Sequence, residues 1–574
     1  MKNISLLAAL CALSFCTYSQ TSFNARSNFK ADLDTQFDKG SAITTIPLDP
    51  RKTNDLVIVG KVWGFVKYYH PALYTGDVNL DYELFRILPK ILQCNSDQER
   101  NEILVTWIRQ LGAINPEKEK KPDSAKIKVY PDVKWIDEVS VLGGPLSALL
   151  NDIKNASRTR ECYYLGRQKG GNPDFKHEKA YEDMHFPDAG FRLLALYRYW
   201  NMIQYFFPYK YLIQENWHNV LAEFIPKFVN AATELDYKLT TLALIARIHD
   251  THAGMYDQII EKHRGNYYAP LAITFVENKA VVTGFLHKEL GPKTGLQNGD
   301  IIISVNGKST ESIVKENLPF MPASNYPAQL RNFSSQLLRS ADTVINITYQ
   351  HANSLHKTSL TCYPNNNLVR KYESQDTCFR YVAPDIAYIY PGIIKKDYLS
   401  KVMPDFMKTK GMIMDLRCYP KENIIQEMAK YLLPEPTPFV KFAQPDTEAP
   451  GLFAFTEYPA IGTKNPSYYK GRLVIIVNEN TQSHAEFTAM AMRVAPRAIV
   501  IGSTTAGADG NVSGITLPGG IRTRISGIGV YYPDGRETQR VGIVPDITVQ
   551  PTIQGIIQNR DELLEKAIEI INEK

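Results

Sequence analysis

The sequence predicts a multidomain protein of mixed α and β structure, with an N-terminal helical repeat region, a middle β domain and a C-terminal α/β core. Three observations predict this division. The 574 residues are too many for one ordinary hydrophobic core. Residues 23–262 contain a helical pattern that occurs twice. Residues 366–574 alternate short apolar strands with helical stretches.

The N-terminus has the form of a secretory signal. Lys2 precedes an apolar run from Ile4 to Cys16, and small and polar residues follow. We therefore expect residues 1–20 to be a signal peptide and the mature chain to be periplasmic or extracellular, with no transmembrane segment. Lipid attachment at Cys16 is disfavoured, because Phe15 is a poor match to the small residue expected before it.

Composition excludes several functions. The net charge is +5 and the basic residues are spread along the chain, so we expect no nucleic-acid partner. Two of the seven cysteines lie in the signal, which leaves an odd, sparse set of five rather than a disulfide framework. Nothing in the sequence indicates a nucleotide, a flavin or a metal, so we expect no cofactor. The oligomeric state is left open.

The helical pattern is an internal repeat. WGFVKYYHP at residues 63–71 and WNMIQYFFP at residues 200–208 are 137 positions apart, and the apolar positions that follow each have helical spacing. Residues 23–114 and 187–262 are therefore predicted to be two copies of one helical unit. The polar stretch between them, residues 115–186, is predicted to be irregular.

The two copies differ at their ends. The first copy ends in GAINP (112–116), whereas the second ends in HDTHAG (249–254). A structural role common to both copies would not need His252. Taken alone, this histidine is more simply explained as a helix-end cation that favours the helix dipole. His249 and His252 also have the spacing of a metal pair, but no third ligand follows.

The middle β domain is predicted at residues 266–350. Within GPKTGLQNGDIIISVNGKS (291–309), a Gly-Leu pair leads to Gly299-Asp300, an apolar strand and a turn at Asn306-Gly307. This pattern resembles a PDZ domain of the bacterial type. The resemblance implies a sheet edge that binds an extended peptide, often by its free C-terminus. A purely supporting role for this domain is equally compatible with the sequence.

Ser483 lies at a strand-to-helix corner. The apolar strand at residues 471–477 leads through a short loop to Ser483, where a helical pattern begins. Free backbone N–H groups at a helix start could stabilise an oxyanion beside a serine nucleophile. Ser483-x-x-Glu486 also fits a capping box, in which the serine only caps the helix. Local sequence does not choose between the two.

Four stretches together resemble the tail-specific (C-terminal processing) peptidases and the tricorn core peptidases. They are NENTQSHAE (478–486), IVIGSTTAG (499–507), VGIVPDITV (541–549) and MIMDLRCYP (412–420). The resemblance implies an α/β core of the crotonase/ClpP-like type at residues 366–574. It also implies serine peptidase activity with Ser483 as nucleophile, and polypeptide substrates selected with the help of the PDZ-like domain.

The same resemblance implies the other site residues. Members of the family use either a lysine in T-x-G-K-G or a histidine after a small hydroxyl residue as the base. Ala508 stands at the lysine position, whereas Thr251-His252 matches the histidine arrangement. His252 is therefore implied as the base, with Thr251 helping to place its ring. The implied oxyanion donors are the backbone N–H of His484 and that of Cys418 or Tyr419.

One position departs from the family pattern. The glutamate that orients the histidine in tricorn-type members is matched by Gln539, with Glu537 two residues earlier. Gln539 could hold a neutral imidazole but would stabilise imidazolium less. The main interpretation is an exported serine endopeptidase. The alternative is a catalytically weak or inactive protein that binds a peptide or ligand on the same scaffold, and ester hydrolysis is a weaker third possibility.

Overall fold

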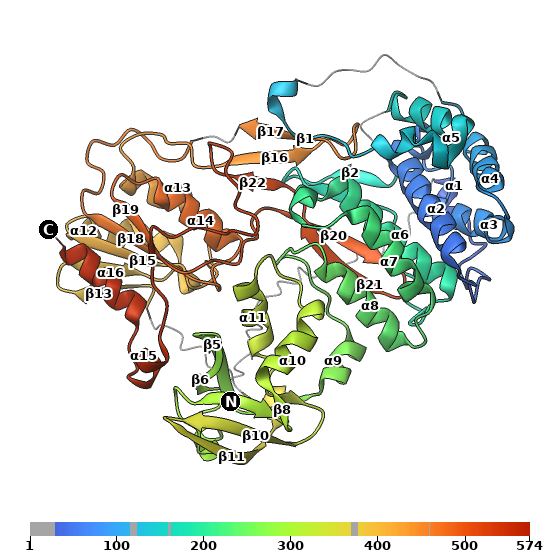
Figure 1. Ribbon diagram of the computed structural model, residues 1–574. Helices are drawn as coiled ribbons and strands as arrows, with labels where there is room; N and C mark the ends of the chain where they lie inside the picture. The colour runs from blue at the N-terminus through green and yellow to red at the C-terminus, as the bar shows by residue number, and fades with distance from the viewer. Residues whose placement is uncertain (1–28, 115–122, 159–161, 369–376, 458–459, 574) are drawn as a thin grey trace, which may run out of the picture.

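The computed structural model describes residues 29–114, 123–158, 162–368, 377–457 and 460–573, and the expected signal peptide with Cys16 lies outside these ranges. The fold mixes helices and sheets, as the sequence predicts. Three regions are visible: a helical half, a β unit and an α/β core (Figure 1). Among the described helices, none is both long enough and apolar enough to cross a bilayer.

The helical half contains the repeated pattern. Its helices are α1 (Lys30–Leu33), α2 (Pro50–Tyr69), α3 (Leu80–Gln93), α4 (Asp97–Gln110), α5 (Val139–Lys154), α6 (Ala189–Phe206), α7 (Trp217–Val229), α8 (Glu234–Ala246) and α9 (Gln258–Arg264). Trp63 Nε1 donates to the Leu80 carbonyl at 2.9 Å. Trp200 Nε1 makes the corresponding bond to the Trp217 carbonyl at 2.8 Å, so the same contact occurs in both helix pairs.

Helices α2 and α6 cross at very short distance. A Cβ atom at Gly64 would lie 1.8 Å from the side chain of Asn201, so only glycine fits there. The Asn201 amide in turn donates to the Gly60 carbonyl at 3.0 Å. Small residues one turn apart on α2 therefore let the two helix backbones approach, and the surrounding aromatic side chains form one continuous core.

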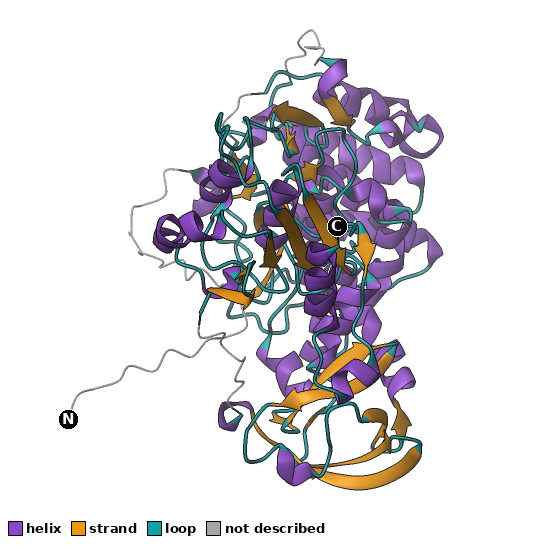
Figure 2. Cartoon of the chain, turned by 90° about the vertical axis from the view of Figure 1, so that its left-hand side faces the viewer, coloured by secondary structure: helices purple, strands orange, loops and turns teal. Residues whose placement is uncertain are grey.

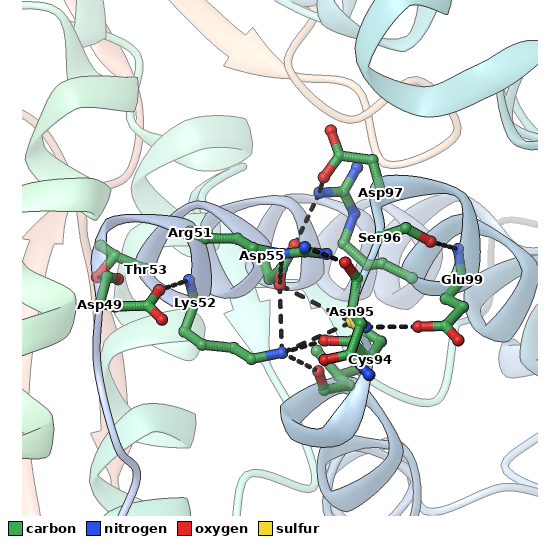
Figure 3. A network of polar contacts seen from close by, with 12 residues as sticks. Asp49, Arg51, Lys52, Thr53, Asp55, Cys94, Asn95, Ser96, Asp97 and Glu99 are labelled. Carbon is green, nitrogen blue, oxygen red and sulfur yellow. Dashed lines mark hydrogen bonds and ion pairs between the residues drawn. The ribbon is translucent and has the colours of Figure 1, made fainter.

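A buried ion network joins α2 to α3 and α4. Arg100 and Asp55, both fully buried, form an ion pair at 2.9 Å. Lys52 lies 3.6 Å from the same carboxylate and donates to the carbonyl of Ile91, near the end of α3. Figure 3 shows Lys52 and Asp55 of α2 facing Cys94. Because each buried charge has a partner, this network ties the first helices together.

The expectation of an irregular stretch at residues 115–186 is wrong for part of it. Helix α5 occupies Val139–Lys154, and two short strands, β2 (Leu165–Arg167) and β3 (Pro173–Phe175), form a hairpin. The sequence pattern did not predict α5, because Gly143 and Pro145 interrupt it. In the structure Gly143 has a positive φ of 66°. These residues kink the helix near its start, where proline is tolerated.

The β unit lies between the other two regions in the sequence and forms a separate lobe at the bottom of Figure 2. Its main sheet has the order β11-β10-β7-β6-β5, with β8 paired to β7. The elements are β5 (Leu271–Val276), β6 (Lys279–Phe285), β7 (Ile301–Val305), β8 (Lys308–Ser309), α10 (Thr310–Asn317), α11 (Tyr326–Ser334), β10 (Val344–His351) and β11 (Ser354–Thr361). The turn between β7 and β8 has positive φ at both Asn306 and Gly307, as its Asn-Gly sequence favours.

The α/β core is built on a sheet with the order β13-β14-β15-β18-β19-β23, parallel from β14 onward. Its strands are β13 (Phe379–Ala383), β14 (Ile386–Ile389), β15 (Gly411–Asp415), β18 (Arg472–Val477), β19 (Ala498–Gly502) and β23 (Ile547–Thr548). Helices α12 (Leu399–Phe406), α13 (Ile425–Leu432) and α14 (His484–Arg493) cover one face and α16 (Glu562–Asn572) the other. The loops after β15 and β18 therefore meet at one edge.

Two further sheets connect the core to the helical half. Strands β1 (Ile127–Val129), β17 (Phe453–Glu457), β16 (Lys441–Pro445) and β22 (Gly529–Tyr531) form one sheet in that order, and β20 (Val512–Leu517) pairs with β21 (Ile521–Ser526). Ile515 and Ile525 of the β20–β21 hairpin belong to the helical hydrophobic core. Figure 1 shows this hairpin beside α6 and α8. Burial of its apolar face brings the two halves of the chain together.

Candidate active site

Ser483 has a strained backbone conformation at the start of α14. Its φ and ψ are 54° and −116°, in a region that residues with a Cβ rarely adopt. The ordinary helix caps Ser96 and Thr233 are extended instead, with φ of −146° and −134°. Such strain costs roughly 1–3 kcal/mol and persists where a site requires it. Helix capping alone does not explain it, whereas a nucleophile exposed on a strand-to-helix turn has this geometry.

A buried carboxylate holds this corner in place. The Ser483 N–H donates to Glu486 Oε2 and to the Ala508 carbonyl, both at 3.0 Å. Glu486 also accepts from the N–H groups of Gly507 at 2.8 Å and Ala508 at 3.1 Å. Burial raises the pKa of Glu486, and these hydrogen bonds act in the opposite direction. The corner at Ser483 and the turn at residues 505–508 are thus fixed to one another.

Backbone donors are available around the Ser483 side chain. A cavity of about 530 Å³ is lined in part by Ser483, His484 and Tyr419. Within the described ranges, no hydrogen bond involves the N–H of His484 or of Tyr419. The loop carrying Tyr419 is positioned by Arg417, which lies 2.7 Å from both Asp415 and Asp561. Both N–H groups are therefore without a protein acceptor among the described residues.

The thiol of Cys418 is buried rather than reactive. Its side chain is largely buried, and burial raises its pKa to about 12. Its Sγ lies 3.5 Å from the Asp415 carbonyl. The thiol is therefore protonated at neutral pH and is a packing group rather than a nucleophile.

Thr251 links the helical half to the same turn. Its hydroxyl donates to the Ala506 carbonyl at 2.8 Å and accepts the Ser324 N–H at 2.8 Å. Its own N–H donates to Ser324 Oγ at 2.9 Å. Thr251 thus anchors the backbone beside His252 rather than the imidazole ring. The 505–508 turn is therefore bonded both to Ser483 and to Thr251, the neighbour of His252, although the two lie far apart in the sequence.

The His252 ring is buried and has a hydroxyl partner. Nδ1 lies 2.9 Å from Ser526 Oγ, and that hydroxyl donates to Asp250 Oδ1 at 3.0 Å. Burial lowers the pKa of His252, Asp250 raises it and Arg524 lowers it. At neutral pH the ring is therefore uncharged, as a general base must be before it accepts a proton.

The two residues expected to orient His252 lie elsewhere or act indirectly. Glu537 accepts hydrogen bonds from Lys128 at 2.9 Å and from the Tyr211 hydroxyl at 2.8 Å, and no contact with His252 occurs among the described residues. Gln539 is buried, with its Nε2 3.5 Å from Asp250 Oδ1 and 3.4 Å from Ser324 Oγ. It therefore faces the neighbours of His252 rather than the ring.

Sequence reasoning missed Asp250 and Ser526. Asp250 was visible in HDTHAG, where the second helical copy gains polar residues that the first lacks. Ser526 gave no signal, because it is an ordinary hairpin residue until the fold places it 2.9 Å from Nδ1 of His252. In the part of the chain that is described, no group of three or more His, Cys, Asp or Glu side chains is arranged to hold a metal ion.

Comparison with known proteins finds that most of the α/β core resembles a family of peptidases. Residues 385–549 match the model of peptidase family S41. The solved structure of mature CPAF complexed with lactacystin has a TM-score of 0.52 at 12% identity, covering 67% of this chain and 98% of that one. This similarity supports the fold alone. No curated protein sequence matches the chain.

Two more distant structures were also found. A putative peptidase from Parabacteroides merdae has a TM-score of 0.41 at 15% identity, covering 67% of this chain and 97% of that one. The photosystem II D1 C-terminal processing protease has a TM-score of 0.36 at 16% identity, covering 64% of this chain and 96% of that one.

The match of residues 385–549 to the model of peptidase family S41 confirms the expectation of a serine-type peptidase.

Proposed function

We propose that this protein is an exported serine endopeptidase with Ser483 as nucleophile and His252 as general base, because residues 385–549 match the model of peptidase family S41. The observation that carries the proposal is the strained backbone of Ser483 in the lining of a cavity, next to the N–H of His484, which has no hydrogen-bond partner among the described residues. Export rests on the signal-like residues 1–20.

In the proposed reaction, Nε2 of His252 accepts the hydroxyl proton of Ser483 while Oγ bonds to the peptide carbonyl carbon. The C–N bond then breaks, and the imidazolium returns the proton to the leaving amine. Water hydrolyses the resulting ester by the same steps, which regenerates Ser483. The N–H groups of His484 and Tyr419 would stabilise the oxyanion. The reaction requires Nε2 and Oγ to come within hydrogen-bond distance in the substrate complex.

Substrate selection is assigned to the cavity and the β unit. Polypeptides are the substrates of peptidases, and the cavity beside Ser483 is bordered by β16 and β17 through Phe442 and Thr456. The sequence of the β unit resembles that of a PDZ domain, and β5 lies at one edge of its sheet. An extended peptide bound along such an edge would be held near the Ser483 loop, because α11 contacts both β5 and that loop.

The test is labelling with a serine-reactive fluorophosphonate, comparing wild type with Ser483→Ala and His252→Ala. Wild type is expected to label, and both variants are expected to lose nearly all signal. Matched controls are the exposed residues Ser467→Ala and His263→Ala, which should label like wild type. Cleavage of an internally quenched peptide should follow the same order.

Two outcomes would contradict the proposal. Equal labelling of wild type, Ser483→Ala and His252→Ala would exclude this pair as the reactive groups. A folded wild type that neither labels nor cleaves peptide would support the alternative, a protein that only binds peptide. The glutamine at position 539 is consistent with that alternative.

A further inference from the structure

Asp250 is a fully buried carboxylate that the proposed reaction does not yet use. Its Oδ1 accepts the backbone N–H of His252 at 3.0 Å and the Ser526 hydroxyl at 3.0 Å. Its Oδ2 accepts the Ser526 N–H at 2.6 Å. Both oxygens therefore face donors, which is the pattern that a carboxylate satisfies.

The charged surroundings of Asp250 are unusual. A buried carboxylate is costly unless a cation or several hydrogen bonds compensate it. Among the described residues, the one basic side chain within ion-pair distance of Asp250 is His252, with Nδ1 3.9 Å from Oδ1. Arg524, the other charged group that affects His252, acts against protonation of the ring. Asp250 is therefore the group that can favour an imidazolium at this position.

The hydrogen-bond chain also selects the tautomer of His252. The Ser526 hydroxyl has one proton, and it donates that proton to Asp250. Its oxygen must then accept from His252, so Nδ1 carries the ring proton at the 2.9 Å contact. Nε2 is consequently left with a lone pair. A base that is to take a proton from a serine hydroxyl needs this tautomer.

Gln539 cannot supply the negative charge that a glutamate at this position would provide to stabilise a protonated His252. Its amide Nε2 lies 3.5 Å from Asp250 Oδ1, where it acts as a weak donor to that carboxylate. It thus supports the acid rather than replacing it.

We infer that Asp250, acting through the Ser526 hydroxyl, is the positioning acid that orients His252 and stabilises its protonated form. This inference rests on the proposed function of His252 as the base. It assigns the orienting role to the residue two positions before the histidine, and it explains how the site can contain glutamine at position 539.

The first test measures activity against pH for Asp250→Asn, with Asp132→Asn as control. Asp132 also lies beside a histidine, with His218 Nε2 3.4 Å away, and its other side-chain partners are Gln204 and Lys210 of the helical half. Asp250→Asn is expected to lower kcat by about 10²-fold or more with little change in KM. Its acid limb is expected to shift to lower pH, because removing the carboxylate lowers the pKa of His252. The control Asp132→Asn should match wild type in kcat and in the pH of the acid limb.

The second test separates positioning from folding. Ser526→Ala removes the relay and is expected to give a smaller loss in kcat, because Asp250 remains 3.9 Å from Nδ1. In Asp250→Asn/Gln539→Glu, a carboxylate returns within reach of the same place. Partial recovery of kcat and of the acid limb is expected. If Asp250→Asn has the kcat of wild type and the same acid limb in its pH–activity profile, the inference is overturned.

The third test does not need turnover. Nitrogen-15 NMR of labelled histidines, with the His252 signal assigned by its loss in His252→Ala, reports tautomer and pKa directly. The Nδ1–H tautomer is expected in wild type, and a lower pKa of His252 in Asp250→Asn. An Nε2–H tautomer, or the same pKa in both proteins, would overturn the inference. If wild type fails to react with fluorophosphonate, the proposed function falls, and this measurement still decides the relay.

Discussion

Arg331, on helix α11 of the β unit, donates to the Glu479 carbonyl at 2.6 Å and to the Gln482 side chain at 2.9 Å. Both acceptors lie in the loop that leads into Ser483. On the same helix, the N-cap Asn325 donates to the Thr505 carbonyl at 2.8 Å. The β unit is therefore bonded directly to the segments that hold the candidate nucleophile.

Arg331→Met is expected to slow fluorophosphonate labelling about 10-fold. Methionine keeps an unbranched apolar side chain but removes charge-assisted hydrogen bonds that are worth about 1.5–3 kcal/mol. The loop before Ser483 would lose its fixed position, while the hydrophobic core of the β unit would remain. The measurement is the second-order rate constant of labelling.

The control for this variant is Arg536→Met. The side chain of Arg536 is 73% exposed and lies outside the β unit, so its rate constant should equal that of wild type. An unchanged rate constant in Arg331→Met would mean that the β unit does not position the nucleophile loop.

Asp509→Asn is expected to stabilise the protein at alkaline pH. Asp509 is buried in the wall of the cavity, and within the described chain its Oδ2 has no hydrogen-bond partner. Burial raises its pKa well above the usual value, and Glu486 raises it further. The folded state therefore retains a proton that the unfolded state releases above pH ~3.9. Stability from this group is lost as pH rises toward the folded pKa.

The melting temperature of Asp509→Asn and of wild type should be compared from pH 5 to pH 9. The advantage of the variant should grow with pH, by at most about 1.4 kcal/mol per pH unit. The exposed Asp534→Asn serves as control and should show no such trend. A variant that is destabilised equally at every pH would mean that Asp509 is ionised in the folded protein.

His70 is expected to make the helical half sensitive to acid. Its ring is fully buried, and its Nδ1 accepts the Ala72 N–H at 3.2 Å. Burial lowers its pKa from 6.5 to about 4. Between these values the unfolded state binds more protons, so stability should fall as pH falls from about 6.5 to 4. The loss attributable to this group is on the order of 3 kcal/mol.

Tryptophan fluorescence can follow this loss in the helical half alone. The five tryptophans of the chain are Trp63, Trp107, Trp135, Trp200 and Trp217. His70→Asn keeps a side chain that can cap the following turn, and its urea midpoint should depend less on pH between 6.5 and 4. His185→Asn, at an exposed position, should retain the wild-type dependence. Equal slopes in wild type and His70→Asn would contradict the assignment.

Local patterns in the sequence were enough to predict much of the fold. The strands at 411–415 and 472–477, the Asn306-Gly307 turn and the corner at Ser483 depend mainly on neighbouring residues, and they occur where the patterns place them. Helix α5 was missed because Gly143 and Pro145 interrupt its pattern, although packing still stabilises the helix.

The sequence by itself determined the chemical groups of the candidate site: a serine at a strand-to-helix corner, a histidine in the second helical copy, and no lysine at position 508. Only the tertiary structure decided which groups surround that histidine. Ser526 is separated from His252 by 274 positions, and it reaches the ring because the β20–β21 hairpin buries its apolar face in the helical core. Contacts at such separation depend on burial and packing between distant segments, and no local pattern in the sequence encodes them.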